Sequence, residues 1–470
     1  MPEIAVDSST ALQRLRDSRD TDREDRYRAY REYYDGDHDT QLSERQRQYL
    51  QLKVGEEFNG NYCPIVVDSL VERLTVTGFE TDKAAQAVFW DWWNANRMDH
   101  QQGVVHMAAV RDGDSFVLVS WDNEEERPTL TFEQAYDGHE GVMVHYSRDT
   151  RKPMFASKRW EDDEKRDRLN LYLPDRVEKY IADDGDNWEK VTETNGDEWA
   201  ADLGIPVIHF AHRDQGYNFG RSDLRDVVPI QNAYNKAIID LVAAADTTAF
   251  RIYTMLGDDP SGLEITPGCW VYSLKPPSGE DSAAIGHIPG EDLSKLIEFK
   301  DAFVMEIARI SRTPLSFFQV SGHRPAEGTL KQEESPLVAR AAKAQTGFGN
   351  AWEDVMQMAA RLSNYFGPAQ GVPKLPDDLQ IDTQWQDAET RNDRTYYETL
   401  KVKGDLGVPQ EILWQEMDYS PEQIEDMKGS EEYQSRQASR DMLMQMAQGG
   451  GKGESADDED EGGEDEDNRA

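Results

Sequence analysis

The centre of the chain begins with SDLRDVVPIQNAYNKAIIDLVAAADTTAF, residues 222–250, where apolar residues recur at the three- and four-residue spacing of a helix. Ser222 is placed to cap this helix, and Pro229 is expected to kink it or restart it one turn later. A second helix with the same apolar spacing is predicted for Asp292–Arg312, and a long helical run for about Thr329–Tyr365. The other elements precede, separate or follow these three helices.

The segment between the first two helices is punctuated by Gly and Pro. It predicts three short strands, Arg251–Leu256, Cys269–Leu274 and Ala284–Ile288. After the second helix, Ser316–Gly328 contains Gly322, Pro325 and Gly328 and predicts a loop. Two helices that leave a body, carry a small β module at their far ends and return are an unusual plan. This plan favours a structural protein over a free-standing enzyme core.

Helices and strands also occupy the regions before and after this central part. One charged helix is predicted for Ala11–Tyr34. A second helix is expected to begin near Pro64, and two more are predicted for Ala84–Asn96 and His100–Arg111. From residue 112 to residue 210 the apolar period changes to two, which predicts a β-rich domain of antiparallel strands with a half-exposed sheet. In the C-terminal part, a strand is predicted for Leu379–Trp385, and helices are predicted for Glu389–Lys403, Pro409–Met417 and Pro421–Met446. The expected fold class is therefore α+β.

Length and composition indicate a folded protein. The 470 residues suffice for two or three domains or one elongated subunit, and 11 Trp, 19 Tyr and 15 Phe supply a core. No apolar run approaches the length needed to span a bilayer, and Met1–Asp25 lacks the apolar core of a signal peptide. We therefore expect a soluble protein made in a cytoplasm, without a membrane partner.

The formal net charge of -41 is the strongest compositional feature. The tail Gln448–Ala470 holds ten acidic residues against Lys452 and Arg469, so removing it changes the charge only from -41 to -33. An acidic surface repels nucleic acid on average, which argues against a conventional DNA-binding module. The charge and the scarcity of Lys relative to Arg suggest adaptation to a high-salt cytoplasm as a hypothesis. An acidic protein of an ordinary host is the alternative.

Patterns for catalysis or metal binding are missing from the sequence. It contains no Gly-rich phosphate loop, nucleophile elbow, H-E-x-x-H motif or Cys/His zinc spacing. Asp35–Asp39 alternates carboxylates as calcium loops do, but it lacks the sixth-position Gly and the twelfth-position acid, so we interpret it as a solvated turn. Cys63 and Cys269 are expected to be buried or half-buried thiols, and His209 and His212 to be structural histidines. We predict no catalytic residue, metal or cofactor.

Five short motifs together resemble one protein family. They are, in chain order, Tyr33-Tyr34-Asp35-Gly36, Asn61-Tyr62-Cys63-Pro64-Ile65-Val66-Val67-Asp68, Phe219-Gly220-Arg221-Ser222-Asp223-Leu224, Val228-Pro229-Ile230-Gln231-Asn232-Ala233-Tyr234-Asn235-Lys236 and Thr313-Pro314-Leu315. These motifs agree in order and spacing with the helix–β–helix–loop–helix plan. On these grounds the chain from about Tyr27 to Met446 resembles the portal proteins, or head-to-tail connectors, of tailed double-stranded DNA viruses.

The resemblance implies a portal fold with a β-rich wing, a two-helix stem, a small α/β clip, a tunnel loop with a long helix, and a helical crown. By position, these parts are the wing 1–221, the stem helices 222–250 and 292–314, the clip 251–291, the tunnel loop 315–328, the long helix and return to the wing 329–389, the crown 390–447 and a disordered acidic tail 448–470.

The resemblance also implies a function and partners. Portal subunits form a ring, usually of twelve copies, around a channel at one capsid vertex, through which a terminase motor packages DNA and from which DNA is later ejected. The expected partners are therefore further copies of the chain, the terminase large subunit, a neck or head-completion adaptor, the major capsid protein and scaffold, and double-stranded DNA passing without sequence specificity. The expected location is the virion, after assembly in the host cytoplasm.

Three groups of site residues follow from the resemblance. In the tunnel loop region His323, Arg324 and Lys331 are candidates for phosphate contacts on an otherwise acidic wall, with salt bridges to nearby acids as the alternative. In the stem, the candidates for subunit contacts are Leu241, Val242, Phe303 and Ile307, with an internal stem core as the alternative. In the clip, the candidates for motor or adaptor docking are Asp258, Asp259, Trp270 and Tyr272.

Two other function classes compete with the portal interpretation. One is a structural head or neck adaptor that is not the portal, which a central channel would distinguish. The other is a carboxylate–metal hydrolase, which would require metal-dependent turnover.

Overall fold

The computed structural model describes residues 7–17, 20–40, 42–44, 46–48, 59–147, 149–182, 187–191, 203–214, 216, 218–249, 252–256, 270–274, 284–287, 292–318, 327–376, 379–389, 393–417, 419, 421–430 and 433–435. The chain divides into two compact units, Met1–Thr390 and Arg391–Ala470. Each unit is described by itself below.

The N-terminal segment forms two helices where the sequence predicted one. They are α1 (Ser8–Asp17) and α2 (Thr21–Asp35). The break has a local cause, because the Asp20 side chain accepts a hydrogen bond from the Arg23 backbone N–H at 3.1 Å and caps α2. The next elements are α4 (Cys63–Val71), β1 (Val76–Glu80), α5 (Lys83–Ala95) and α6 (Met98–Asp112).

The β-rich region contains two sheets rather than one. A three-stranded antiparallel sheet has the order β3-β2-β9, from β2 (Asp114–Asp122), β3 (Arg127–Gln134) and β9 (Val207–Ala211). A five-stranded antiparallel sheet follows chain order, from β4 (Gly141–Tyr146), β5 (Pro153–Glu161), β6 (Asp167–Tyr172), β7 (Val177–Ala182) and β8 (Glu189–Lys190). Ala11 and Leu15 of α1 pack on the second sheet against Phe155 and Leu169, which anchors the N-terminal helix there.

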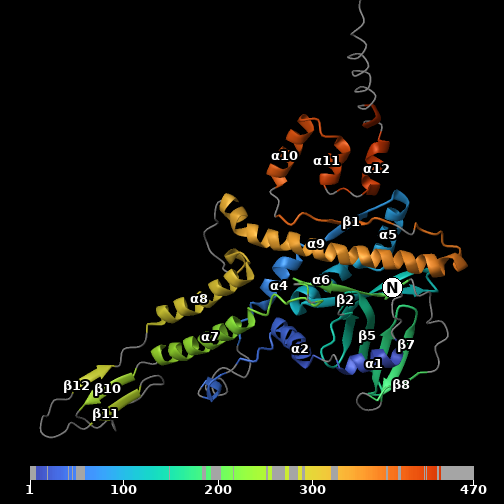
Figure 1. The fold of residues 1–470 in the computed structure, drawn as a ribbon. Helices are drawn as coiled ribbons and strands as arrows, with labels where there is room; N and C mark the ends of the chain where they lie inside the picture. The colour runs from blue at the N-terminus through green and yellow to red at the C-terminus, as the bar shows by residue number, and fades with distance from the viewer. Residues whose placement is uncertain are drawn as a thin grey trace, which may run out of the picture. The chain divides into compact units, whose positions relative to one another are not determined.

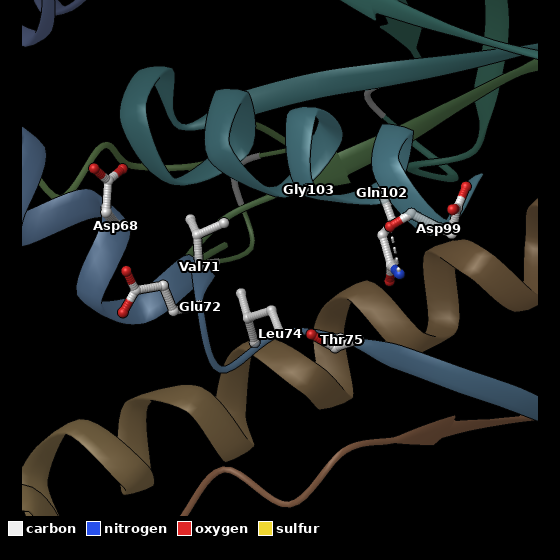
Figure 2. Close-up of a pocket in the computed structure, with 8 residues that line it drawn as sticks. All are labelled: Asp68, Val71, Glu72, Leu74, Thr75, Asp99, Gln102 and Gly103. Atoms are coloured by element: carbon white, nitrogen blue, oxygen red, sulfur yellow. Dashed lines mark hydrogen bonds between the residues drawn. The ribbon is translucent and has the colours of Figure 1, made fainter. Parts of the chain in front are cut away.

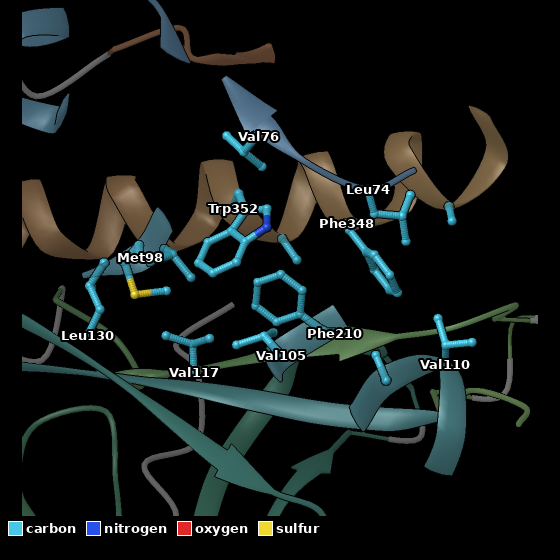
Figure 3. Packing of buried hydrophobic residues seen from close by; sticks show 14 of the residues in the cluster. Leu74, Val76, Met98, Val105, Val110, Val117, Leu130, Phe210, Phe348 and Trp352 are labelled. Atoms are coloured by element: carbon cyan, nitrogen blue, oxygen red, sulfur yellow. The ribbon is translucent and has the colours of Figure 1, made fainter. Parts of the chain in front are cut away.

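The long helix α9 (Glu327–Phe366) carries the main core (Figure 3). Trp352 lies edge-on to Trp93 and Phe210, with ring centroids 4.9 and 4.7 Å apart. Its indole N–H donates to Nε2 of the fully buried His106, whose Nδ1 lies 3.0 Å from the Leu74 carbonyl oxygen. Burial lowers the pKa of His106 to about 3, so the imidazole is a neutral, fully partnered part of the core.

Two helices leave this body as an arm (Figure 1). The outgoing helix is α7 (Val228–Ala249) and the returning helix is α8 (Leu293–Ser311), and the two pack side by side. Between them lies a three-stranded sheet of order β11-β10-β12, from β10 (Ile252–Leu256), β11 (Trp270–Leu274) and β12 (Ala284–His287). In this sheet β10 pairs parallel with β11 and antiparallel with β12.

The expected effect of Pro229 is confirmed. Residues 223–227 form turns, and α7 starts at Val228, so Pro229 falls in its first turn. Ser222 caps the turns, since its hydroxyl oxygen accepts a hydrogen bond from the Leu224 N–H at 2.9 Å. The predicted strand near Leu379 is β13 (Asp382–Trp385), which pairs antiparallel with β1. Two short 3-10 turns, η2 (Leu315–Phe317) and η3 (Gly367–Gln370), flank α9.

The second unit contains α10 (Asp393–Asp405), α11 (Gln410–Glu416) and α12 (Pro421–Gly429). Ion pairs join the helices: Lys403 Nζ lies 2.7 Å from Glu416 Oε2, and Lys428 Nζ lies 3.1 Å from Glu411 Oε2. The third helix is shorter than predicted, and residues 436–446 lie outside the described part. Over the described ranges of both units, none of the helices combines the length and apolarity that a bilayer crossing requires.

Candidate functional site at the base of the arm

The base of the arm is the place where α7 begins, α8 ends and α9 passes. At its centre is the carboxylate of Asp223, whose side chain is only 2% exposed. Arg340 of α9 donates one N–H to Asp223 Oδ2 and another to the carbonyl oxygen of Ser311, which is the last residue of α8. Through one guanidinium, the long helix is therefore tied to the end of α8 and to the turns that lead into α7.

Two further side chains complete this cluster. Arg213 Nη1 donates to Asp223 Oδ1 at 3.0 Å, and His212 Nε2 lies 3.2 Å from the same oxygen. Burial opposes ionisation of Asp223, but His212, Arg340 and Arg213 offset it and hold the pKa of the carboxyl below its usual value. The cluster is an internal ion network, and His212 has the structural role that the sequence predicted.

A second buried carboxylate, Asp114, fixes the segment that enters the base. It accepts hydrogen bonds from Tyr27 Oη at 2.5 Å and from the Gly220 N–H at 2.7 Å, and His209 Nε2 lies 2.7 Å away. Gly220 has no room for a side chain, because a Cβ atom there would lie 1.9 Å from the Gly113 carbonyl oxygen. The glycine of the Phe219-Gly220-Arg221 motif is therefore required for steric reasons.

Two other motifs meet on α7. Gln231 donates to the Gly60 carbonyl oxygen at 2.5 Å and accepts from the Tyr62 N–H at 3.0 Å. Asn235 Oδ1 accepts from the Gly60 N–H at 3.1 Å, and Asn232 exchanges hydrogen bonds with the Tyr33 hydroxyl at 2.7–2.9 Å. Segments about 170–200 residues apart in sequence are thus held together by side-chain amides.

The turn after α2 packs against α7 rather than standing free in solvent. His38 Nδ1 lies 2.7 Å from Asn235 Nδ2, and His38 Nε2 lies 3.1 Å from the Tyr33 carbonyl oxygen. Burial lowers the pKa of His38, which suits a neutral ring that accepts at Nδ1 and donates from Nε2. His38 is half-buried, which differs from the predicted solvated turn, whereas its flanking acids Asp37 and Asp39 are exposed as that prediction expects. Among the described residues no His, Cys, Asp and Glu cluster could hold a metal ion.

The predicted tunnel and clip residues are only partly described. Lys331 lies on the second turn of α9 and is exposed, whereas His323 and Arg324 lie outside the described residues. In the clip, Asp258 and Asp259 also lie outside them. Trp270 and Tyr272 form part of β11, but their side chains are not described.

Of the predicted stem contacts, Ile307 belongs to the interior of its own subunit. It is 0% exposed and is part of the main core, so the alternative of an internal stem core applies to it. Leu241, Val242 and Phe303 are half-buried. The apolar pattern could not distinguish a core residue from a subunit contact, because apolar residues cover more of the circumference of α8 than the side that faces the core.

The surface of α8 has two apolar flanks. Its buried side is formed by Val304, Ile307, Ala308 and Ser311. One flank carries Phe299 and Ile310, which are 55% and 40% exposed, with Phe303 between them at helical spacing. The opposite flank carries Met305, which is 36% exposed. Ile297 is 44% exposed and continues the buried side toward the start of the helix, seven residues before Val304. Opposite the buried side, Lys295, Ala302 and Arg309 recur every seven residues and form a polar stripe.

A separate cavity of about 340 Å³ lies between α4 and α6 (Figure 2). Its lining includes the carboxylates of Asp68, Glu72 and Asp99 together with Leu74 and Gln102. Gln102 has structural partners, since its Oε1 accepts from the Val76 N–H at 2.7 Å.

The comparison with protein families identifies the chain. A family model described as "Phage portal protein, SPP1 Gp6-like" matches residues 15–437. The chain belongs to this phage portal protein family. The family predicted from the sequence motifs is thereby confirmed.

Individual relatives agree with the family. The chain is similar to the portal protein of Mycobacterium phage D29, with 22% identity over 393 residues that cover 78% of this chain and 77% of the relative. It is also similar to the portal protein of Mycobacterium phage L5, with 23% identity over 408 residues, covering 82% and 79%. This protein is therefore a viral portal protein, related to those of tailed phages.

Among solved structures, the portal chain is similar to a chain in the neck of an empty GTA particle computed with C6 symmetry. The TM-score is 0.45 with 12% identity, covering 78% of this chain and 91% of that chain. A chain in the virion of the native gene transfer agent particle gives a TM-score of 0.39 with 11% identity, covering 74% and 85%.

Proposed function

We propose that this portal protein forms a closed ring, of twelve copies, around a channel at one capsid vertex, through which DNA is packaged and later ejected. The observation that carries the proposal is the arm, two packed helices with a small sheet between them, on a chain of the portal family. In this assignment residues 1–221 are the wing, α7 and α8 the stem, and 251–291 the clip. Residues 315–328 are the tunnel loop and 390–447 the crown.

The two apolar flanks of α8 support ring assembly. A ring with one kind of subunit needs two different, complementary faces on each copy, because every contact is head-to-tail. Exposed Phe299 and Ile310 on one flank and Met305 on the other give α8 apolar surface on two sides, one for each neighbour. Leu241, Val242 and Phe303 remain proposed subunit contacts, and Ile307 is withdrawn from that set.

The remaining partners follow from the proposed position at the vertex. The clip, with Asp258, Asp259, Trp270 and Tyr272, would face the terminase large subunit during packaging and a neck adaptor afterwards. The wing and crown would contact the major capsid protein and scaffold. The tunnel loop, with His323, Arg324 and Lys331, would contact DNA phosphates. The role is structural, in the virion, without catalysis by this chain.

The proposed interface is tested by Phe299→Asp combined with Ile310→Asp. Both side chains are exposed in the single chain, so the change should alter the free energy of unfolding by less than about 0.5 kcal/mol. A buried carboxylate at a subunit contact would oppose assembly. The expected result in analytical ultracentrifugation is a folded monomer where the wild type forms a ring.

The matched control is Glu298→Gln combined with Ala302→Ser on the polar stripe side of the same helix, which should leave the oligomer unchanged. Rings of normal size in the Phe299/Ile310 variant would contradict the proposed use of α8.

A further inference from the structure

The C-terminal unit has more large apolar side chains on its surface than in its interior. Over the part of this unit that the structure describes, Leu400 and Ile424 are the buried ones, at 2% and 7% exposure. Five others are exposed by 43–80%, namely Tyr397, Val402, Leu406, Ile412 and Tyr419. Two buried side chains are a small interior for three helices, so a further apolar element is needed to cover this surface.

Three of the exposed side chains lie on either side of the turn that joins α10 to α11. Val402 and Leu406 are one helical turn apart, since the Leu406 N–H donates to the Val402 carbonyl oxygen at 3.0 Å, and Ile412 lies in α11. The two helices lie next to each other and are joined by the Lys403–Glu416 ion pair (Figure 1). We call Val402, Leu406 and Ile412 the apolar surface of the C-terminal unit.

The described chain ends on the same pair of helices. Tyr433 packs against Trp414 of α11, with ring centroids 5.1 Å apart, and its hydroxyl donates to Glu411 Oε1 at 3.0 Å. The last described residue is Ser435, two positions later. The chain that follows therefore departs from α11, the helix that carries Ile412.

The following residues, 436–447, have an apolar face of their own. Met442, Leu443 and Met446 have the spacing i, i+1 and i+4, which places them on one side of a helix. The preceding residues 436–441 can span about 9 Å as a helix and about 20 Å when extended, which is enough to reach along α11 toward the end of α10. We call residues 436–447 the docking segment.

Charge also suits this segment to the unit that precedes it. Residues 393–430 contain nine Asp and Glu against four Lys and Arg, whereas the docking segment contains Arg436 and Arg440 against Asp441. A weakly basic segment with an apolar face complements exposed apolar side chains on an acidic unit. A neighbouring copy would instead bring a largely acidic surface, since the whole chain has 92 Asp and Glu against 51 Lys and Arg.

We propose that the docking segment packs its apolar face onto the apolar surface of the C-terminal unit in the same chain. This contact completes the interior of that unit. It also anchors the acidic tail, residues 448–470, beside α10 and α11, so the tail extends from a fixed point on the protein. The inference goes beyond the proposed ring and applies to a single chain whether or not the ring forms.

Hydrogen exchange measured by mass spectrometry on the full-length protein tests the contact. Leu443→Asp combined with Met446→Asp places two carboxylates on the apolar face of the docking segment. We expect amide exchange over residues 397–417 to become at least about tenfold faster, because the lost contact no longer opposes local opening. Exchange in β2 to β7 should stay unchanged, which shows that the rest of the chain is folded.

The matched control adds the same charge to the opposite side of the docking segment. Gln437 and Met444 are seven residues apart and lie away from the apolar face, so Gln437→Asp combined with Met444→Asp should change exchange by less than about twofold. Deletion of residues 448–470 should have an equally small effect. Equal exchange in the Leu443/Met446 variant and the wild type would overturn the proposal, as would equal acceleration by both double variants or acceleration by the deletion.

Co-expression of two variants separates the chain's own segment from that of a neighbour. One variant carries Leu443→Asp and Met446→Asp, and the other carries Val402→Asp and Leu406→Asp, so their peptides over residues 397–417 differ in mass. Docking within one chain predicts fast exchange in both. Slow exchange restored at the intact apolar surface would show that a neighbouring copy supplies the segment and would overturn the proposal. Sedimentation scores ring formation separately, so absence of a ring would count against the proposed function alone.

Discussion

Arg340 of the long helix and Asp223 at the start of the arm form a buried ion pair across 117 residues of sequence. The same guanidinium holds the last carbonyl of α8. Both ends of the arm are therefore fixed to the helix that follows the predicted tunnel loop.

Loss of this ion pair should destabilise the protein. Arg340→Met keeps the aliphatic bulk but leaves Asp223 with Arg213 and His212 only, and breaking a buried pair costs about 3 kcal/mol. Urea denaturation followed by circular dichroism measures the change. Arg361→Met, an exposed residue of the same helix, is the control and should change the unfolding free energy by less than about 0.5 kcal/mol. Equal effects of the two substitutions would show that Arg340 does not secure the base.

Gly220 should tolerate no side chain. Gly220→Ala places a Cβ against the Gly113 carbonyl oxygen, and the backbone must shift and disturb the Asp114 hydrogen bond. We expect a loss of about 3 kcal/mol or failure to fold. Gly103→Ala is the matched control, since nothing lies within 4 Å of its Cβ and it sits inside α6. That substitution should stabilise the protein by about 0.5–1 kcal/mol. A neutral Gly220→Ala would contradict the described close approach.

The buried His106 predicts a pH dependence. Its pKa is lowered to about 3 in the folded chain, against about 6.5 when unfolded, so below pH 6.5 the unfolded chain takes up a proton that the folded chain does not. The free energy of unfolding should therefore fall as the pH drops from 6.5 toward 3, by about 1 kcal/mol per pH unit. His106→Gln removes this group, and its stability curve should be flatter over that range by about one proton. His38 and His145 add slope of the same sign in both proteins, because burial lowers their pKa values too. Identical slopes for wild type and variant would contradict the assignment.

High salt should stabilise the chain if its host is halophilic. Self-repulsion at a net charge of -41 is largely screened by about 1 M salt, where the Debye length is roughly 3 Å. Adaptation to a high-salt cytoplasm predicts that Tm keeps rising between 1 M and several molar KCl. A Tm that levels off by 1 M would support the alternative of an acidic protein from an ordinary host.

Local sequence patterns predicted most elements of the fold. The period-two segment predicted the strands from β2 to β9 within a few residues, and helical spacing predicted α7, α8 and α9. The break before α2 was missed because a single capping side chain, Asp20, outweighs a continuous helical pattern. The sequence left two roles open for Ile307, a subunit contact or an internal core, because periodicity identifies an apolar face but not which chain covers it.

The base of the arm could not be predicted in the same way. Arg340 and Asp223 carry no local signal that pairs them, since ion pairs between distant segments depend on how the helices pack. Asp223 did fall inside a motif that resembled the portal family, beside the Ser222 cap, and that was the available clue.

The proposed function requires that the chain form a closed ring with a channel. Electron microscopy of the purified full-length protein, at modest and at molar KCl, tests it most directly. We expect closed rings of twelve copies with a central hole, favoured at molar salt because screening weakens repulsion between acidic subunits. Monomers at both salts, or open filaments without a closed channel, would contradict it.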